Sequence, residues 1–508
     1  MKQNRIINML SAVAVALVAT ACSNTDAQYT IPDVAAPQLV STSLTEEKAI
    51  FFGETTIEVT FDQNVNFATK NASMVTINGE PVDKALVLGA DKKLTITKNL
   101  EFCNAITLNI PAGLVANGQG KVYGEEINAT FTAKEKPSNE ATAVSQMLGW
   151  GWNLGNHFDT SGDAIKNGWG YWDQVPVMTA APFQTLAAAG AKTVRMPTTW
   201  TDHMDADYTI SADYLDEVAA AVDLAIGAGL NVILNTHHDS FETDLGNAAT
   251  DPAAYETDST IIVRLWQQVA TRFASYSDKL IFETFNEVHA GDNWGGGTDA
   301  EYALLNQWNQ WAVSTIRATG GNNATRWIGV AGYAANIDMT IDHFVLPTDP
   351  ANRLIVGVHC YDPYNFCLAP YDEAGNPVAP TWGHSANGSS SDELYVINQL
   401  YKLRTAYIEK NIPCYLGEYG CVWKKSDEEN AYRNYYLEFF CRAANLAGIP
   451  MFVWDNNSKD AGNEASGYID HATGAWLNNS ETMVPTMIKA CTSTDASYTF
   501  QTIWNKAP

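Results

Sequence analysis

Apolar runs of strand length alternate with helix-length segments from residue 149 to the end of the chain. The run 354–358 has no polar residue and the run 230–234 has only one, Asn231, which is typical of parallel strands buried on both faces. The Ala-rich segment 214–226, followed by Gly227 and Gly229, has the composition and the stop signals of a helix. The pattern predicts about eight strands alternating with helices, which is a (β/α)8 TIM barrel whose functional loops follow the carboxyl ends of its strands. The predicted strands cover residues 149–152, 194–197, 230–234, 280–287, 327–330, 354–358, 413–420 and 450–454.

Residues 30–135 show a different pattern, in which apolar and polar positions alternate over short runs such as 55–61 and 93–97. Turn residues such as Asn78 and Gly79 separate these runs, so the segment is predicted to be an all-β sandwich. It resembles the immunoglobulin-like modules found beside secreted bacterial hydrolases. The segment contains no Trp, which favours a spacer over a carbohydrate-binding module. A short polar linker then leads into the predicted barrel domain, residues 140–508.

The first 22 residues have the organisation of an export signal. Lys2 and Arg5 precede an apolar stretch at 6–18 that is too short to span a bilayer. Small residues then lead to Cys22, as in bacterial lipoprotein signals, where the cysteine becomes the lipidated N-terminus. The alternative is ordinary secretion with cleavage nearby. We therefore expect an outer-membrane lipoprotein, at the cell surface or facing the periplasm, or otherwise a secreted protein.

Composition narrows the range of partners. The 508-residue chain has a formal net charge of −27, which argues against binding to nucleic acid or to anionic lipid, because both attract basic surfaces. Its 15 Trp and 22 Tyr suit a protein that stacks flat apolar faces on a ligand. We expect a monomer whose contact with the membrane is limited to a lipid on Cys22.

The cysteines show no metal-binding spacing. Export permits disulfides, but without Cys22 seven cysteines remain, so at least one thiol stays free. Cys367 and Cys421 follow neighbouring predicted strands. They either form a bridge or remain buried thiols, and the sequence leaves both alternatives open.

Chemically reactive or polar residues end nearly every predicted strand. Each of two carboxylates, Glu287 and Glu418, follows an apolar run, where an ionised side chain is costly to bury without a partner or a function. Taken alone, either could be a surface residue at a strand end. Their position on the fourth and seventh strands, with similar residues around the same rim, favours a shared cleft. The set comprises Asn156, Arg195, His237, Asn286, Glu287, His359, Tyr361, Glu418 and Trp454.

With these residues the sequence resembles glycoside hydrolase family 5, and it is most similar to subfamily 4, the endo-β-1,4-glucanases and xyloglucanases. The resemblance covers residues 145–504. One departure is Val288, where many members have Pro. The motifs that carry the resemblance are GWNLGN at 151–156, VRMP at 194–197, NTHH at 235–238, FNE at 285–287, VHCY at 358–361, LGEYG at 416–420 and FVWD at 452–455.

The resemblance implies a retaining mechanism in which Glu287 is the acid/base and Glu418 the nucleophile, with the two carboxyl groups roughly 5–5.5 Å apart. Arg195 and Tyr361 are then expected to bond Glu418. Strand alternation would place Asn286 and Glu287 on opposite faces, so a bulge is expected there.

The remaining polar residues of the motifs are expected to bind substrate. Trp454 is expected to stack on the sugar beside the cleaved bond, and the rim residues Trp200, Trp294, Trp382 and Trp423 are candidates for flanking sugars. The other predicted substrate contacts are Asn156, His237, His238, Asn286 and His359. No cofactor and no metal is expected.

Three other functions remain open at this stage. Loops choose the sugar in such barrels, so the enzyme could cleave xyloglucan or a mannan by the same mechanism. A decayed barrel could bind surface glycan without cleaving it, although such a protein would not need the complete set of Glu287, Glu418, Arg195 and Tyr361. A cluster of His237, His238, Asp239 and His359 could also hold a metal, as in a barrel amidohydrolase, although the His-x-His pair of those enzymes is missing.

Overall fold

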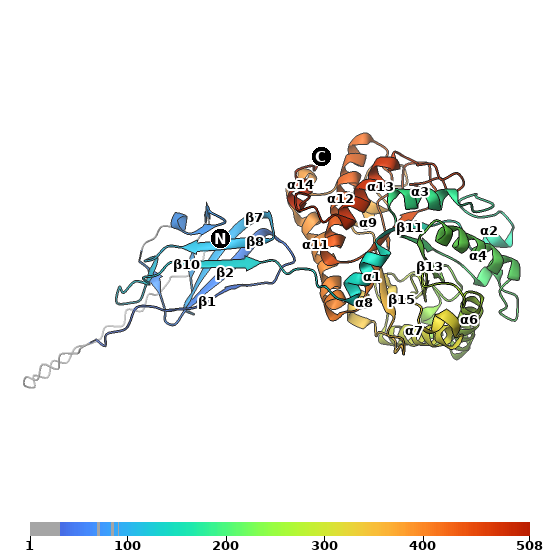
Figure 1. Ribbon diagram of the computed structural model, residues 1–508, viewed down its shortest axis with the longest axis horizontal. Helices are drawn as coiled ribbons and strands as arrows, with labels where there is room; N and C mark the ends of the chain where they lie inside the picture. Colours follow the sequence, from blue (N-terminus) through green and yellow to red (C-terminus); the bar gives the residue numbers. More distant parts are fainter. Residues whose placement is uncertain (1–30, 69–71, 83–85, 90) are drawn as a thin grey trace, which may run out of the picture.

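The structure is a computed structural model, and it describes residues 31–68, 72–82, 86–89 and 91–508. The predicted signal segment and Cys22 lie outside these residues. Within them no helix combines the length and the apolar character needed to cross a membrane. Figure 1 shows two bodies side by side, a β-rich region and a larger barrel.

The β-rich region consists of two antiparallel sheets around a common core. Every second side chain of β2 faces the core over most of the strand. This matches the alternation of apolar and polar residues in the sequence. The core includes Ile57, Val59, Ile96 and Leu108. One sheet has the order β1 (Leu39–Leu44), β2 (Phe51–Phe61), β7 (Lys93–Cys103) and β6 (Val87–Leu88). The other has the order β10 (Ile127–Thr132), β8 (Ala105–Ile110), β4 (Thr76–Ile77) and β5 (Glu80–Pro81), and β3 (Asn66–Phe67) pairs with β9 (Val115–Ala116).

The second body is a closed barrel of eight parallel strands, which confirms the predicted fold class. Each strand pairs with its sequence neighbours, and the first strand pairs with the last. The strands are β11 (Trp150–Leu154), β12 (Thr193–Met196), β13 (Asn231–Asn235), β14 (Leu280–Glu283), β15 (Ile328–Asn336), β16 (Leu354–Cys360), β17 (Cys414–Tyr419) and β18 (Met451–Asp455).

The larger helices surround the barrel and have clear start signals. In α7, for example, Thr298 and Glu301 form a capping box that satisfies backbone N–H groups at the helix start. The long helices are α4 (Ala212–Gly227), α6 (Pro252–Arg272), α7 (Asp299–Ala318), α11 (Ser391–Ala406), α12 (Asp427–Ala447) and α13 (Ser480–Thr492). The shorter ones are α1 (Glu140–Leu148), α2 (Asp163–Lys166), α3 (Ala181–Ala189), α5 (Leu245–Ala248), α8 (Ile337–His343), α9 (Tyr364–Cys367), α10 (His384–Asn387) and α14 (Phe500–Trp504).

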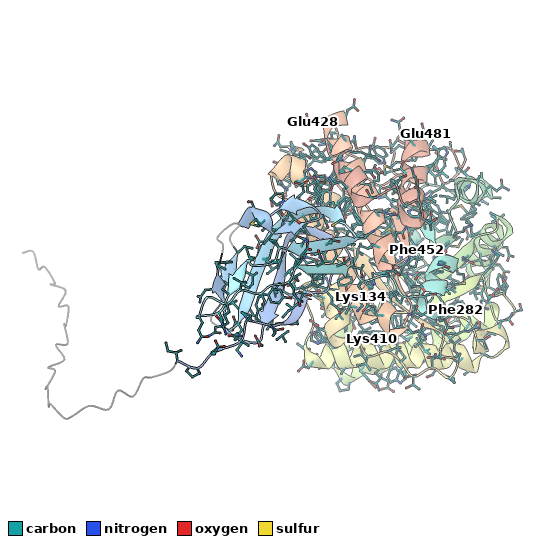
Figure 2. All side chains as sticks on the ribbon, turned by 60° about the vertical axis from the view of Figure 1, so that its left-hand side comes forward. Lys134, Phe282, Lys410, Glu428, Phe452 and Glu481 are labelled. Carbon is teal, nitrogen blue, oxygen red and sulfur yellow. The ribbon has the colours of Figure 1, made fainter. Side chains whose placement is uncertain are left out.

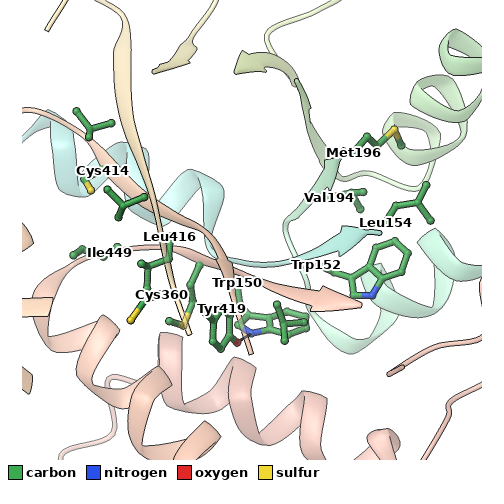
Figure 3. Close-up of a cluster of buried hydrophobic side chains, with 14 of the residues drawn as sticks. Trp150, Trp152, Leu154, Val194, Met196, Cys360, Cys414, Leu416, Tyr419 and Ile449 are labelled. Atoms are coloured by element: carbon green, nitrogen blue, oxygen red, sulfur yellow. Dashed lines mark hydrogen bonds between the residues drawn. The ribbon is translucent and has the colours of Figure 1, made fainter. Parts of the chain in front are cut away.

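Apolar side chains pack on both faces of the barrel strands. Leu148, on α1, belongs to a compact cluster with Ile233, Ile281 and Phe452. On the other face, Trp150 packs against helices, and its indole N–H donates to the Tyr419 hydroxyl at 2.7 Å (Figure 3). These contacts fix the strands, and therefore the residues that follow their carboxyl ends.

The contact between the two bodies is aromatic. Phe102 of β7 stacks on Phe52, with ring centres 3.8 Å apart, and packs against Phe500 and Phe439 of the barrel domain. Trp504 of α14 also contacts Phe52, at 4.8 Å. Phe102 is only 9% exposed and belongs to the core of the barrel. The interface is therefore more extensive and more apolar than the short linker suggests.

Polar contacts reinforce this junction. The buried guanidinium of Arg404, on α11, donates to the backbone carbonyls of Lys134 and Glu135 in the linker. The Lys134 ammonium lies 2.7 Å from the Glu409 carboxylate, and Figure 2 shows Lys134 at the boundary between the two bodies. The start of the linker is thus held on the barrel domain.

A chain that begins at Ser138 is expected to keep its turnover on soluble glucan and to lose thermal stability. Removal of Phe52 and Phe102 exposes Phe500 and Trp504, and burial of one such ring contributes about 1.5–3 kcal/mol. The catalytic rim lies on loops that the sandwich does not build. Melting temperature and turnover of the two chains, measured side by side, test this. An unchanged melting temperature, or a large loss of turnover in a folded truncated chain, would contradict it.

Candidate active site

Arg195, near the end of β12, is the centre of the polar cluster at the barrel mouth. Its side chain is fully buried. The guanidinium donates to Glu418 at 2.7 Å, to Glu283 at 2.7 Å, to Asn286 at 2.8 Å and to Asn153 at 2.9 Å. A planar fork of five N–H donors is suited to holding several oxygens in fixed positions. Arg195 therefore links the ends of three other strands, β11, β14 and β17.

Glu418, on β17, is an ionised carboxylate held by three groups. Arg195 donates to one of its oxygens, and the Tyr361 hydroxyl donates to the other at 2.9 Å. Burial alone would raise the pKa of Glu418, but His359, Arg195 and Tyr361 outweigh burial and lower it. The side chain is therefore a fixed anion that faces the cleft.

Glu287 lies opposite Glu418, and His359 stands between them. The Nδ1 atom of His359 is 2.6 Å from a Glu287 oxygen and 3.8 Å from a Glu418 oxygen. Burial lowers the pKa of His359, but the two carboxylates outweigh burial and raise it. One carboxylate oxygen of each glutamate and a nitrogen of His359 all lie within 4.8 Å of one another. An upper limit of 4.8 Å between these carboxylate oxygens is compatible with the roughly 5–5.5 Å between the carboxyl groups of retaining glycosidases and is shorter than the roughly 6.5–9.5 Å of inverting ones.

A change in backbone path brings Asn286 and Glu287 into the same cleft. We predicted a bulge within a strand reaching residue 287, but β14 ends at Glu283, so strand alternation no longer constrains the two side chains. Glu242 holds the segment instead. Its carboxylate accepts from the Asn286 amide at 2.8 Å and from the backbone N–H of Glu287 at 3.3 Å.

The two histidines after β13 differ in exposure and charge. His237 is buried, and desolvation lowers its pKa well below the usual value, so it is neutral. The Nδ2 atom of Asn235 lies 3.2 Å from His237 Nδ1. The orientation of the Asn235 amide is fixed because its Oδ1 accepts from the backbone N–H of Thr198. Because the Nδ2 group of Asn235 can only donate, His237 Nδ1 is the acceptor. The proton of the neutral ring is therefore on Nε2, which can donate a hydrogen bond. His238 is more exposed and pairs with Glu242 at 3.0 Å.

Of the four residues of the alternative metal cluster, only His237 and His238 lie together. One carboxylate oxygen of Asp239 accepts from the backbone N–H groups of Trp200 and Thr201. His359 lies between the two glutamates. Asp159 instead approaches His237 and His238, with one possible ligand atom from each within 4.8 Å of the others. A proton on His237 Nε2 does not suit a metal ligand, which must offer a lone pair.

Trp454 and Asn156 form one wall of the site. The Trp454 ring lies parallel to that of His237, with centres 5.9 Å apart. Gly155 permits this arrangement, because a Cβ there would lie 2.7 Å from the indole and 2.6 Å from the Asp455 carbonyl. Asn156 follows with a left-handed backbone, φ 62°, which turns the chain away from the barrel.

Most of the tryptophans that we expected at the rim belong to the core. Trp200 and Trp382 are at most 1% exposed and Trp423 is 9% exposed, so the prediction is wrong for these three. Trp294 is 53% exposed, as expected for a rim residue. The sequence interpretation also missed an exposed Trp172, which lies near His238 at 5.9 Å between ring centres.

Glu283 is the main site residue that sequence reasoning missed. It accepts three hydrogen bonds from Arg195, one from Asn235 at 3.0 Å, and one from the Tyr415 hydroxyl at 2.5 Å. Its carboxylate compensates the buried guanidinium, so Arg195 is not balanced by Glu418 alone. The available signal was a second glutamate within the same apolar run that precedes Glu287.

A buried charge network holds the loop behind Trp454. His471 Nδ1 lies 2.9 Å from Asp173, and its Nε2 lies 3.4 Å from Asp455. Asp455 also accepts from the indole N–H of Trp152 at 2.8 Å. Burial lowers the pKa of His471, but the two aspartates outweigh burial and raise it to about 9. The network therefore contains a protonated histidine at neutral pH.

This histidine is expected to make stability depend on pH. Because its pKa is raised on folding, its contribution is fully present below pH about 6.5, the unfolded value, and is lost as pH rises through about 9. The melting temperature of the wild-type protein should fall over that interval. In His471→Gln the melting temperature should be lower at pH 6 and should change less between pH 6.5 and 9. Parallel curves for the two proteins would contradict this account.

A (β/α)8 barrel with two carboxylates at this spacing, one of them fixed by an arginine and a tyrosine, defines the class of glycoside hydrolases. Comparisons with known proteins agree. The family model for cellulase, glycosyl hydrolase family 5, matches residues 155–460. The chain belongs to this family.

Among relatives, Endoglucanase A of Clostridium longisporum is 34% identical over 351 residues, which cover 66% of this chain and 63% of that enzyme. Among solved structures, a Bacteroidetes-affiliated family 5 cellulase linked with a polysaccharide utilization locus is 37% identical, with a TM-score of 0.67 and coverage of 73% of this chain and 98% of that one. A subfamily 4 broad-specificity endoglucanase from Bacteroides salanitronis is 40% identical, with a TM-score of 0.64 and coverage of 71% and 97%.

Proposed function

We propose that the protein is a retaining endo-β-1,4-glucanase acting on plant polysaccharides, with Glu418 as nucleophile and Glu287 as acid/base. The observation that carries this proposal is the separation of the two carboxylates, whose nearest oxygens lie within 4.8 Å of each other. The names of the relatives, which are endoglucanases, and the family match support the same activity.

In the proposed first step, Glu287 donates its proton to the glycosidic oxygen while a Glu418 oxygen attacks the anomeric carbon. The C–O bond to the leaving sugar breaks, and a covalent glycosyl–Glu418 ester forms. Glu287, now a carboxylate beside His359, then removes a proton from water. The water oxygen attacks the same carbon, and Glu418 leaves as an anion that Arg195 and Tyr361 stabilise.

The other polar residues of the motifs are proposed to bind the sugars. His237 offers an Nε2–H donor, and Asn286 is held between Arg195 and Glu242 within reach of the same cleft. Asn156, His238 and His359 complete this set. Trp454 provides a flat face on which a pyranose ring can stack.

The width of the site bears on which glucan is cleaved. A hollow of about 980 Å³ adjoins Asn156, between the loops that follow β11 and β18. Its lining is mostly polar and includes Trp172, Asp173, Asn456 and Asn457. Such a space beside the chain-binding residues favours acceptance of a branched glucan such as xyloglucan as a second substrate.

Purified protein tested on carboxymethylcellulose, xyloglucan, lichenan and glucomannan checks the proposal. Endo-cleavage should lower viscosity faster than reducing ends accumulate, with β-glucans preferred over mannan. A surface glycan-binding protein would bind these polymers and release no product, which would refute the proposed activity.

We further propose that the chain is divided into an immunoglobulin-like sandwich at 30–135 and a catalytic domain at 140–508. The sandwich acts as a spacer, which its lack of Trp supports. The signal-like segment before Cys22 supports export with a lipid on that cysteine. The proposed enzyme works as a monomer at the cell surface or in the periplasm.

A further inference from the structure

Cys367 and Cys421 come together behind the catalytic strands. Cys367 ends α9, and Cys421 lies two residues beyond the end of β17. Both are free thiols and both are fully buried. The backbone N–H of Val422 donates to the Cys367 carbonyl at 2.8 Å, and the Cys421 thiol donates to the carbonyl of Phe366, the residue before Cys367, at 3.7 Å. The fold thus brings two cysteines from distant segments together.

Two buried cations surround this thiol pair. Lys424 is 2% exposed, and its ammonium lies over the Phe366 ring at 4.2 Å and donates to the Phe366 carbonyl. Arg433 is fully buried, lies 3.8 Å from the Trp423 ring centre and donates to the Cys421 carbonyl at 2.8 Å. Within residues 31–508, apart from the few left undescribed, neither cation forms an ion pair with a carboxylate.

Buried charge without a counter-ion is costly, so a nearby group that can become negative is stabilised. Cys421 is that group. Burial alone would raise its pKa, but the neighbouring Cys367 thiol and the charges of Lys424 and Arg433 lower it to about 7. The pKa of Cys367 is instead raised well above its usual value. The pair therefore has the asymmetry of a thiolate beside a protonated thiol.

We propose that Cys421 and Cys367 are an oxidation site, at which a hydroperoxide converts the thiol pair into a disulfide. The Cys421 thiolate attacks one peroxide oxygen, the O–O bond breaks, and a sulfenic acid and hydroxide form. The Cys367 sulfur then attacks the Cys421 sulfur, and the sulfenic oxygen leaves with the Cys367 proton as water. The two thiols together lose two electrons, which reduce the peroxide.

The bridge would join the two segments that hold the nucleophile. Cys421 lies three residues after Glu418, and Cys367 lies six residues after Tyr361, whose hydroxyl donates to Glu418. A covalent link at this point restricts separation of those segments on heating. The oxidised protein is therefore expected to lose activity more slowly at high temperature than the reduced protein.

The test uses the reduced, folded full chain treated with hydrogen peroxide, followed by removal of peroxide, denaturation, alkylation and peptide mapping by mass spectrometry. A cross-linked pair of peptides containing Cys367 and Cys421 is expected. Cys414 provides an internal control, because it is buried without such cations and its pKa is raised. It should remain alkylated.

Two variants test whether the charge of Lys424, and not burial alone, makes Cys421 reactive. Lys424→Gln should slow formation of the bridge about tenfold or more, since the thiolate loses its neighbouring charge. Lys425→Gln, at the adjacent exposed position, should leave the rate unchanged. Circular dichroism establishes that each variant is folded. If Lys424→Gln does not fold, the pH profile of the wild-type rate is the alternative test: the rate should rise from pH 6 and level off above pH about 7, whereas a thiol with its ordinary pKa would keep rising to pH about 9.

Three results would overturn the proposal. Alkylation of Cys367 and Cys421 to the same extent as Cys414 after peroxide would show that they do not react. Oxidation of Cys421 to sulfinic acid without a bridge would show that Cys367 does not resolve it. Equal rates of bridge formation in wild-type protein and a folded Lys424→Gln variant would show that the charge of Lys424 does not promote the reaction.

Discussion

Glu418→Gln is expected to lower turnover roughly 10⁴-fold or more while the protein remains folded. The amide keeps the size of the carboxylate but is a very poor nucleophile, so the covalent intermediate does not form. Arg195 is not left as an unpaired buried cation in this variant, because Glu283 still pairs with it through three hydrogen bonds. The fold should therefore survive the change.

Initial rates on an aryl cellobioside, together with the melting temperature, check this expectation. Glu256→Gln, at an exposed position on α6, is a matched control that should keep full activity. Substantial turnover in Glu418→Gln would contradict the assignment of this residue as nucleophile. A large drop in melting temperature would instead show that Glu283 does not compensate Arg195.

Glu287→Ala is expected to reduce turnover about 10²–10⁴-fold on substrates that need protonation of the leaving group. With an activated leaving group the first step still proceeds, because Glu418, Arg195 and Tyr361 are unchanged. The glycosyl–enzyme then accumulates, since no base activates water. Added azide should restore turnover and give a β-glycosyl azide, because a small anion needs no base and attacks from the same face as water.

The product of rescue distinguishes the two carboxylates. Rescue of Glu418→Ala by azide should give the α-glycosyl azide, because the anion then replaces the nucleophile itself. Recovery of the β-azide from Glu418→Ala, with no rescue of Glu287→Ala, would reverse the two roles.

Much of the fold is encoded in local patterns. The apolar runs that precede Glu283 and Glu418 correctly predicted buried parallel strands, because their side chains face helices on one side and the barrel interior on the other. The same reasoning predicted that the residues of the barrel mouth lie together, since the carboxyl ends of all eight strands meet at one rim.

Other features depend on contacts that no local pattern contains. Whether a loop tryptophan is exposed, as Trp294 is, or buried, as Trp200 is, depends on which segment covers it. In the sequence, Glu283 resembles any polar residue in a strand. Its role depends on the contact with Arg195, which lies 88 positions earlier in the chain. In the sequence, Phe102 fits the alternating pattern of a sandwich strand. Only the fold shows that its side chain belongs to the hydrophobic cluster of the barrel domain.

The most direct test of the central claim is to trap the glycosyl–enzyme with a 2-deoxy-2-fluoro cellobiosyl fluoride. The fluorine slows both steps, and the good leaving group keeps the first one fast enough for the ester to accumulate. Peptide mapping of the inactivated protein should place one fluorosugar on Glu418. A fluorosugar on Glu287, or an unlabelled enzyme that releases product with inverted anomeric configuration, would contradict the account.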